Sequence, residues 1–157
     1  MLKELVEKLL DLGKTISTME SCTGGGVANA ITNIAGASEV LKFSAVTYSN
    51  EFKIKMGVSN EIIDKYSVYS METAEEMSKN ISVFTNSDFG VGITGKLNSN
   101  DSSNPEGEND IVFVSIYDKE KDKYYNTTIK VLVQSREKNK ELIITKINDL
   151  ILEILNQ

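Results

Sequence analysis

The sequence predicts an α/β protein: a single-domain, three-layer α/β/α sandwich on a mixed, mostly parallel sheet of about five strands. Segments with the spacing of amphipathic helices alternate along the chain with short segments rich in β-branched and aromatic residues. Residues 111–117 form a nearly continuous apolar run, which is typical of a strand covered on both faces. The 157 residues, 40% hydrophobic with one proline, suffice for one buried core, so we expect a single domain over residues 1–157.

The first half of the chain is predicted to run as helix, strand, glycine turn, helix and strand. Residues 1–12 place leucines and a valine on one face of an amphipathic helix, which Gly13 ends. A strand from Ile16 passes into a turn with three consecutive glycines and then into a helix that starts near Val27. Aromatic and β-branched side chains over residues 43–48 predict the second strand.

The middle of the chain is predicted to be mostly helical. We expect two short helices, over residues 51–56 and 60–66, and a longer helix over residues 71–85 with Ser70 as its N-cap. A third strand over residues 89–94 contains two glycines, which indicates that another element packs closely against it.

The last third of the chain starts with a long polar loop over residues 95–110. Loops of this length in compact domains are usually functional or disordered. The apolar strand that follows is expected to pair with a strand over residues 124–133 through a charged turn at residues 118–123, and this hairpin introduces an antiparallel strand. Residues 137–155 form a long amphipathic helix that closes the domain.

Composition argues against several classes of function. The formal net charge is −6 and no block of Lys and Arg is interleaved with aromatic residues, so we expect no nucleic-acid partner. No apolar run is long enough to cross a membrane, and the first residues carry acids unlike a signal peptide. We therefore expect a cytoplasmic protein without a membrane partner. Its one cysteine, Cys22, allows no internal disulfide, which agrees with a reducing compartment.

The absence of histidine narrows the chemistry further. It removes Ser-His-Asp and Cys-His arrangements, histidine-ligated zinc sites and histidine general bases together. If the protein is an enzyme, its general base is a lysine, a carboxylate or a tyrosine.

The glycine turn, residues 20–26, is the feature around which the chain is organised. A strand that passes through such a turn into a helix points backbone N–H groups and the positive end of a helix dipole at one place, which suits a phosphate, a carboxylate or an oxyanion. Ser21 and Thr23 add hydroxyl groups beside these amides. The alternative is a plain N-cap, because Ser and Thr begin helices for local reasons alone.

Three candidate catalytic side chains follow the ends of the first two strands. The carboxyl ends of parallel strands carry the ligand sites of α/β proteins, and Ser21, Tyr48 and Lys53 are expected near that edge. A lysine whose pKa is lowered by burial can activate a serine, and a tyrosine can bridge the two. The alternative is that Lys53 is an ordinary surface lysine and Tyr48 a core residue.

Several sequence blocks together resemble one family. They are the blocks at residues 20–25 (ESCTGG), 34–38 (IAGAS), 46–53 (VTYSNEFK), 56–58 (MGV) and 92–95 (GITG), followed by Arg136. In order and separation they resemble the C-terminal domain of CinA and the stand-alone PncC-type nicotinamide-nucleotide amidohydrolases. The resemblance covers nearly the whole chain, and the first and third blocks are the most specific.

The resemblance implies hydrolysis of the carboxamide of nicotinamide mononucleotide to nicotinic acid mononucleotide and ammonia, without a metal or other cofactor. It implies that Ser21 is the nucleophile, that Lys53 takes its proton and that Tyr48 relays or orients. It also implies that amides near the glycine turn stabilise the oxyanion or hold the ligand. The substrate-binding positions that it implies are Glu20, Cys22, Thr23, Gly24, Gly25, Asn50, Thr94, Gly95 and Arg136. Activity of the N-terminal CinA domain is not expected.

One departure from the family pattern concerns the loop at residues 95–110. The amidohydrolases carry a second glycine-rich loop there, whereas this loop is poor in glycine and contains four acids, which should favour a phosphate less. They are Asp101, Glu106, Glu108 and Asp110. The alternative function is therefore a catalytically degenerate module that binds a nucleotide or a protein. The resemblance and the apolar last helix also predict a homo-oligomer.

Overall fold

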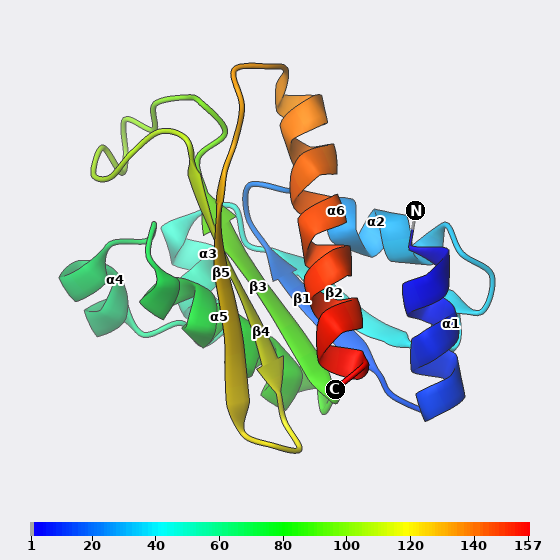
Figure 1. Ribbon diagram of the computed structural model, residues 1–157. Helices are drawn as coiled ribbons and strands as arrows, with labels where there is room; N and C mark the ends of the chain where they lie inside the picture. Colours follow the sequence, from blue (N-terminus) through cyan, green and yellow to red (C-terminus); the bar gives the residue numbers. More distant parts are fainter. Residues whose placement is uncertain (1) are drawn as a thin grey trace.

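Five strands form one mixed sheet with helices on both faces (Figure 1) in the computed structural model, which describes residues 2–157. The strand order across the sheet is β2-β1-β3-β4-β5. The strands are β1 (Ile16–Glu20), β2 (Leu41–Val46), β3 (Phe89–Gly95), β4 (Ile111–Asp118) and β5 (Lys123–Lys130). β1 pairs in parallel with β2 and β3, whereas β4 runs antiparallel to both β3 and β5. Four strands thus share one direction, and the predicted mixed α/β fold is confirmed.

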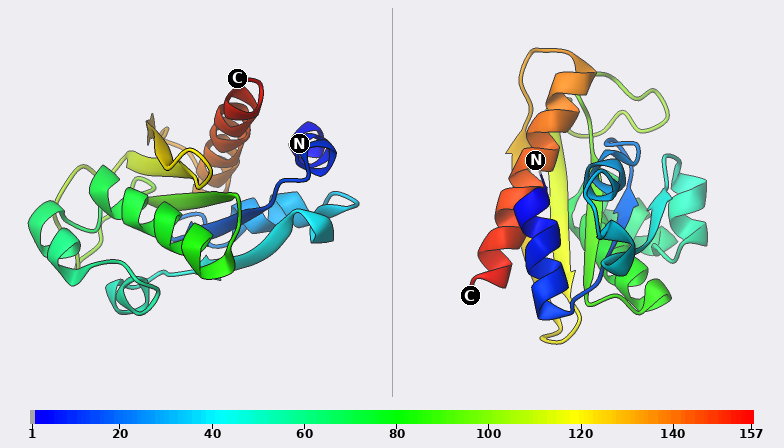
Figure 2. Two further views of the ribbon diagram at one scale, coloured as in Figure 1. Left: turned by 90° about the horizontal axis from the view of Figure 1, so that it is seen from below. Right: turned by 90° about the vertical axis from the view of Figure 1, so that its right-hand side faces the viewer.

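The helices form the two outer layers of the sandwich. They are α1 (Lys3–Leu12), α2 (Gly26–Thr32), α3 (Asn50–Lys55), α4 (Asn60–Tyr66), α5 (Met71–Thr85) and α6 (Arg136–Leu155). The larger core joins the apolar faces of α1, α2 and α6 to one side of the sheet. A smaller core joins α4 and α5 to the other side, and the two layers are seen edge-on in Figure 2.

Local sequence signals set several of these boundaries as predicted. Gly13 ends α1 in the left-handed conformation at φ 63°. Ser70 caps α5, because its hydroxyl accepts a 3.1 Å hydrogen bond from the Thr73 N–H. The second and fifth strands end earlier than predicted, at Val46 and Lys130. The segment after Val46 is therefore free to leave the sheet and enter the site described below.

The two glycines of β3 allow α5 to lie directly on the sheet. A Cβ atom added at Gly90 would lie 2.0 Å from the Ser78 carbonyl oxygen, and one added at Gly92 would lie 2.2 Å from the Ala74 carbonyl oxygen. Both contacts are to backbone atoms, which a side-chain rotation cannot relieve. The prediction that an element packs closely on this strand is thus confirmed.

The apolar stripe of α6 is used inside the molecule. Its isoleucines at positions 143, 147 and 151 are completely buried in the larger core. This stripe therefore provides no surface for a second copy, and the expectation of a homo-oligomer now depends on the family resemblance alone. Over residues 2–157, no helix is both long and apolar enough to cross a membrane.

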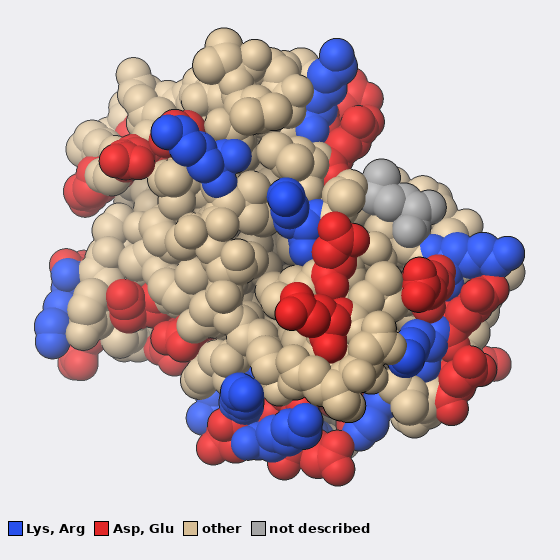
Figure 3. Space-filling model, in the orientation of Figure 1, with Lys and Arg blue, Asp and Glu red and all other residues tan. Residues whose placement is uncertain are grey.

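Charged side chains are mixed by sign on the surface. On the face shown in Figure 3, the described Lys and Arg residues are interspersed with Asp and Glu and form no continuous basic band. Among the described residues, no group of three or more Cys, Asp or Glu side chains gathers in a way that could hold a metal ion.

Candidate active site

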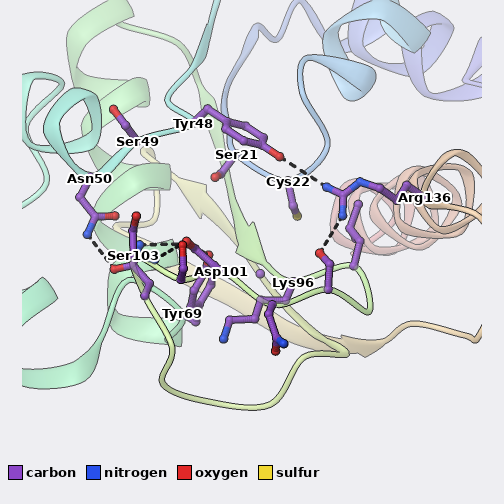
Figure 4. A pocket seen from close by; sticks show the side chains of 16 residues that line it. Ser21, Cys22, Tyr48, Ser49, Asn50, Tyr69, Lys96, Asp101, Ser103 and Arg136 are labelled. Atoms are coloured by element: carbon purple, nitrogen blue, oxygen red, sulfur yellow. Dashed lines mark hydrogen bonds between the residues drawn. The ribbon is translucent and has the colours of Figure 1, made fainter.

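A cavity of about 490 Å³ opens at the carboxyl ends of β1, β2 and β3 (Figure 4). This is the edge at which ligand sites of α/β sheets are found. The segments after all three strands line it, together with Tyr69 before α5 and the first residue of α6. The lining residues are Ser21, Cys22, Tyr48, Ser49, Asn50, Tyr69, Gly95, Lys96, Leu97, Ser99, Asn100, Asp101, Ser102, Ser103, Asn104 and Arg136.

Ser21, which lines this cavity, is in contact with Lys53, which does not line it. The Lys53 Nζ lies 3.0 Å from the Ser21 Oγ and 2.7 Å from the Thr47 carbonyl oxygen, within hydrogen-bond distance of both. Lys53 is only 2% exposed, so the alternative of a surface lysine is excluded. It reaches this position because the Ser49 hydroxyl accepts a hydrogen bond from the Phe52 N–H and so starts α3 one turn before Lys53.

Burial lowers the pKa of Lys53 from 10.5 to about 8, because removing the ammonium group from water disfavours its charged form. Coulombic interactions with Cys22 and Asp101 oppose this shift and are smaller. At neutral pH a fraction of the molecules therefore carries an uncharged Lys53 amine beside the Ser21 hydroxyl. That arrangement suits a serine nucleophile with a lysine base.

Cys22 lines the cavity next to Ser21, but its thiol is not activated. Burial raises the pKa of Cys22 to about 12, and the nearby positive charge of Lys53 lowers it only in part. The thiolate, which is the nucleophilic form of cysteine, is therefore scarce near pH 7. The predicted choice of Ser21 over Cys22 agrees with this environment.

Glu20, a substrate-binding position by the resemblance, does not line the cavity, because its carboxylate is fully buried under the start of α2. It accepts hydrogen bonds of 3.0 Å from the Val27 and Ala28 N–H groups. The Thr23 hydroxyl donates to it at 2.6 Å and the Thr18 hydroxyl at 2.9 Å. The predicted anion site at this helix N-terminus thus exists, but the protein's own carboxylate fills it.

The glycine turn shapes the site without lining it. Gly24 and Gly25 adopt φ values of 61° and 90°, which bend the chain back toward α2, and neither residue borders the cavity. Thr23 is also buried away from it. The structure thus places none of these three predicted substrate-binding residues at the cavity wall. Cys22 does line the cavity, and among the described residues its N–H makes no hydrogen bond to another residue, although it interacts with the Cys22 side chain itself.

Tyr48 lies in the cavity, and its hydroxyl faces Arg136. Its ring is 65% exposed, and its hydroxyl accepts a 3.4 Å hydrogen bond from the Arg136 guanidinium. Over residues 2–157, no hydrogen bond joins this hydroxyl to Ser21 or Lys53, and Figure 4 shows it directed at Arg136. Arg136 also donates to the Ser99 hydroxyl at 2.9 Å. Tyr48 thus helps to position Arg136 rather than the proposed nucleophile.

The remaining predicted binding residues divide between the cavity and the core. Asn50 and Gly95 line the cavity, and the Asn50 amide donates to the Asn104 side chain at 2.9 Å. Thr94 is completely buried, does not line the cavity and donates to the Val68 carbonyl at 2.9 Å. The structure thus places Thr94 away from the cavity wall, where its hydroxyl ties β3 to the segment before α5.

Only one of the four loop acids lies at the cavity. Asp101 lines it, whereas the side chains of Glu106 and Glu108 are exposed elsewhere and Asp110 pairs with Lys130 at 3.7 Å. The expected accumulation of negative charge is therefore smaller than the sequence indicated.

Several polar residues that line the cavity were not predicted as site residues, among them Tyr69, Lys96 and Asp101, the last named only as an acid of the loop. The Tyr69 hydroxyl donates a hydrogen bond to Asp101. Lys96 is 4% exposed, donates to the Glu106 carbonyl at 2.8 Å and lies 4.8 Å from the centroid of the Tyr69 ring. The only sequence signal for this group was the unusual length of the polar loop.

Comparison with known sequences finds one protein family that matches nearly the whole chain. The family model of the CinA C-terminal domain matches residues 1–155. A CinA-like protein of Kosmotoga olearia is 40% identical over 141 residues, which cover 88% of this chain and 33% of that protein. A relative from Caldanaerobacter subterraneus, whose name describes it as competence-damage inducible, is 43% identical over 76% of this chain and 29% of the relative. The chain thus spans about a third or less of these curated relatives.

Solved structures give the same answer. A competence/damage inducible protein from Agrobacterium tumefaciens has a TM-score of 0.84 at 28% identity, with 99% of this chain and 96% of that chain covered. A CinA superfamily protein from Klebsiella pneumoniae has a TM-score of 0.87 at 22% identity, with 99% and 95% covered, which is a likeness of fold alone. Because the family model matches nearly the whole sequence and the fold agrees with it, the chain belongs to the CinA C-terminal domain family.

Proposed function

We propose that the protein is an amidohydrolase that converts nicotinamide mononucleotide to nicotinic acid mononucleotide and ammonia. The observation that carries the proposal is the 3.0 Å contact between the Ser21 Oγ and the Nζ of the buried Lys53. In a chain without histidine, this pair supplies a nucleophile and a base at one point of a cavity. We infer the substrate from the amidohydrolase activity of the family that the sequence resembles.

The first half of the reaction forms an acyl-enzyme. Neutral Lys53 takes the hydroxyl proton of Ser21 as the Oγ attacks the amide carbon, and the carbonyl oxygen becomes an oxyanion. The Cys22 N–H, which follows the nucleophile directly, donates to this oxyanion. The Lys53 ammonium then returns its proton to the amide nitrogen, so that ammonia leaves and a nicotinoyl ester of Ser21 remains.

The second half releases the acid. Lys53, again neutral, takes a proton from water as the water oxygen attacks the ester carbon, and the proton returns to the Ser21 Oγ as the ester bond breaks. The Thr47 carbonyl accepts a hydrogen bond from Lys53 throughout, which fixes the direction of the Lys53 lone pair. No step uses the thiol of Cys22.

The shape and charge of the cavity fit a small nucleotide. Its volume of about 490 Å³ lies in the range of ligand pockets in general. We assign Arg136 to the phosphate, because a guanidinium binds phosphate oxygens in a bidentate way and this one is held at the cavity by Ser99 and Tyr48.

A second candidate, nucleotide binding without turnover, is favoured by the wall at residues 99–104. Asparagine, serine and aspartate side chains build this wall where the amidohydrolases have a glycine-rich loop. A wall of side chains leaves less room for close backbone contacts with a phosphate than glycine does.

Ammonia release from nicotinamide mononucleotide by the purified protein tests the proposal. We expect release by the parent protein and by Ser59→Ala, which removes a serine hydroxyl that makes no cap hydrogen bond. Ser21→Ala should reduce release by at least about 10³-fold, the size of a lost nucleophile. Calorimetry with the same nucleotide separates the candidates: binding without any ammonia from the parent protein would favour the binding module.

A further inference from the structure

Asp101 places a negative charge at the cavity and forms no salt bridge among the described residues, although its charge acts on Lys53 through space. Its carboxylate accepts hydrogen bonds from the Tyr69 hydroxyl, from the Ser103 N–H at 3.0 Å and from the Asn104 amide at 3.1 Å. All three donors are neutral, and over residues 2–157 Asp101 forms no salt bridge. The Tyr69 hydrogen bond is the largest of the causes that hold the pKa of Asp101 below its usual value, so the carboxylate is charged at neutral pH.

Among the described residues, neither of the two cations that line the cavity forms an ion pair with Asp101. Lys96 donates to the Glu106 carbonyl and lies 3.5 Å from the Asn109 side-chain oxygen. Arg136 is held by Ser99 and Tyr48 and comes from the α6 side, whereas Asp101 comes from the loop near Asn50 (Figure 4). Arg136 and Asp101 therefore approach the cavity from different sides, and Lys96 lies on the side of Asp101, with its Nζ 4.8 Å from the centroid of the Tyr69 ring.

The environment of Asp101 suits an organic cation rather than a metal ion. Over the described chain, no second and third acidic or cysteine side chain joins it in a metal-binding group. The rings of Tyr48 and Tyr69 also line the cavity, and aromatic faces attract flat cationic rings. A ring with a delocalised positive charge would thus meet both a carboxylate and aromatic surfaces.

We infer that Asp101 makes the site selective for substrates whose amide-bearing ring is positively charged. The identity of this ring rests on the proposed function: in nicotinamide mononucleotide it is a pyridinium, and in the reduced nucleotide it is a neutral dihydropyridine of nearly the same shape. Asp101 distinguishes these two forms, while Arg136 contacts the phosphate that both of them carry. Asp101 acts on specificity and takes no part in proton transfer.

The test measures binding rather than turnover, so that it does not depend on catalysis. Dissociation constants of oxidised and reduced nicotinamide mononucleotide are measured by calorimetry in Ser21→Ala, with and without Asp101→Asn. The matched control is Glu108→Gln in the same background, because it removes an equal charge from the same loop at an exposed position away from the cavity.

We expect the Ser21→Ala protein to bind the oxidised form about fivefold or more tightly than the reduced form, as a partly solvated charge pair would give. Asp101→Asn should bring this ratio close to one, and Glu108→Gln should leave it unchanged. Rising salt concentration should reduce the ratio in Ser21→Ala and have little effect on it in the Asp101→Asn protein. Loss of loop structure would weaken the binding of both nucleotides alike. A change in the ratio of their dissociation constants therefore reports the charge of Asp101.

The two proposals fail in different ways. An unchanged ratio in Asp101→Asn, or no binding of either nucleotide, would overturn the role of Asp101. Ammonia release by the parent protein together with an unchanged ratio would leave the amidohydrolase proposal intact. A ratio that depends on Asp101 in a parent protein that releases no ammonia would reject the amidohydrolase and support a charge-selective binding site.

Discussion

Lys53 donates a 2.7 Å hydrogen bond to the main-chain carbonyl of Thr47, the first residue after β2. This bond links the proposed base to the end of a strand, so the position of the amine is set by the sheet as well as by α3. It also occupies one N–H bond of the amine and leaves the lone pair of the neutral form for Ser21, 3.0 Å away.

The activity should therefore depend on the protonation of Lys53. Burial lowers its pKa to about 8, so the neutral form grows as pH rises through that value. We expect kcat/KM for ammonia release to increase about tenfold from pH 7 and to level off above pH 9. Lys53→Arg, which stays charged, should lose activity by about 10²–10⁴-fold at every pH. Turnover of Lys53→Arg near that of the parent would make Lys53 a fixed charge instead of a base.

The same burial makes stability depend on pH. The pKa of Lys53 is 10.5 when unperturbed and about 8 in the folded protein, so between these values the unfolded chain binds more protons and stability rises with pH. Below pH 8 the full cost of burying the ammonium is present.

Comparison with Lys53→Met, which cannot titrate, isolates this contribution. From pH 7.5 to 10.5 the parent should gain up to about 3 kcal/mol of unfolding free energy relative to the variant. Urea denaturation at a series of pH values measures the difference, and titrating groups that do not interact with Lys53 cancel between the two proteins. A difference that is constant with pH would show that Lys53 titrates normally in the folded state.

Cys22 is expected to be dispensable for the chemistry. Its thiol stays protonated because burial raises its pKa to about 12, so Cys22→Ala should keep activity within about threefold of the parent. Iodoacetamide at pH 7.5 should modify the folded protein slowly, since the thiol is 5% exposed. Mass spectrometry and ammonia release measure both effects. Loss of activity in Cys22→Ala with retention in Ser21→Ala would exchange the two roles.

Glu20 should matter for stability rather than for binding. It receives two backbone and two hydroxyl hydrogen bonds at the start of α2, with one backbone N–H on each carboxylate oxygen, so Glu20→Gln leaves one of these N–H groups facing an NH2 donor instead of an acceptor. We expect a loss of about 2–3 kcal/mol in unfolding free energy, because buried donors are left unpaired. The control is Glu61→Gln, an exposed glutamate in the first turn of α4. Equal effects of the two substitutions would contradict the structural role of Glu20.

Most of the fold was predictable because its signals are local. Gly13 and Ser70 end and begin helices through their own backbone and side-chain preferences, and both act as predicted. The boundaries of β2 and β5 were wrong by a few residues. Apolar side chains such as Tyr48 and Val133 extend the strand pattern but lie on the exposed surface outside the sheet.

The site was only partly predictable, for reasons of geometry. Ser21 and Lys53 stand in local motifs and were found together. Glu20, one residue from Ser21, was assigned to the same cavity, although its side chain points under α2. Tyr69 and Asp101 form a hydrogen bond although they are 32 residues apart in the sequence. Asp101 lies in a loop without a periodic pattern, so this pair could be identified only from the folded structure. The sequence signal that could have placed Glu20 under α2 is an acidic residue shortly before a helix, because its carboxylate can accept hydrogen bonds from the first N–H groups of that helix.

The last prediction concerns Gly92, which holds β3 against α5 and so fixes the strand that ends at Gly95 in the cavity. A Cβ atom there would lie 2.2 Å from the Ala74 carbonyl oxygen and 2.6 Å from the Ser78 nitrogen. Because both contacts are to the backbone, Gly92→Ala forces α5 away from the sheet. It should lower the free energy of unfolding, measured by urea denaturation, by at least about 3 kcal/mol.

Gly107→Ala is the matched control. A Cβ atom at Gly107 meets nothing within 4 Å, and only its φ of 80° makes the substitution unfavourable, by about 1 kcal/mol. The two variants therefore separate steric contact from backbone strain. If Gly92→Ala cost no more than Gly107→Ala, β3 and α5 would be able to move apart without loss, and the close packing of this helix would not be what positions the third strand of the site.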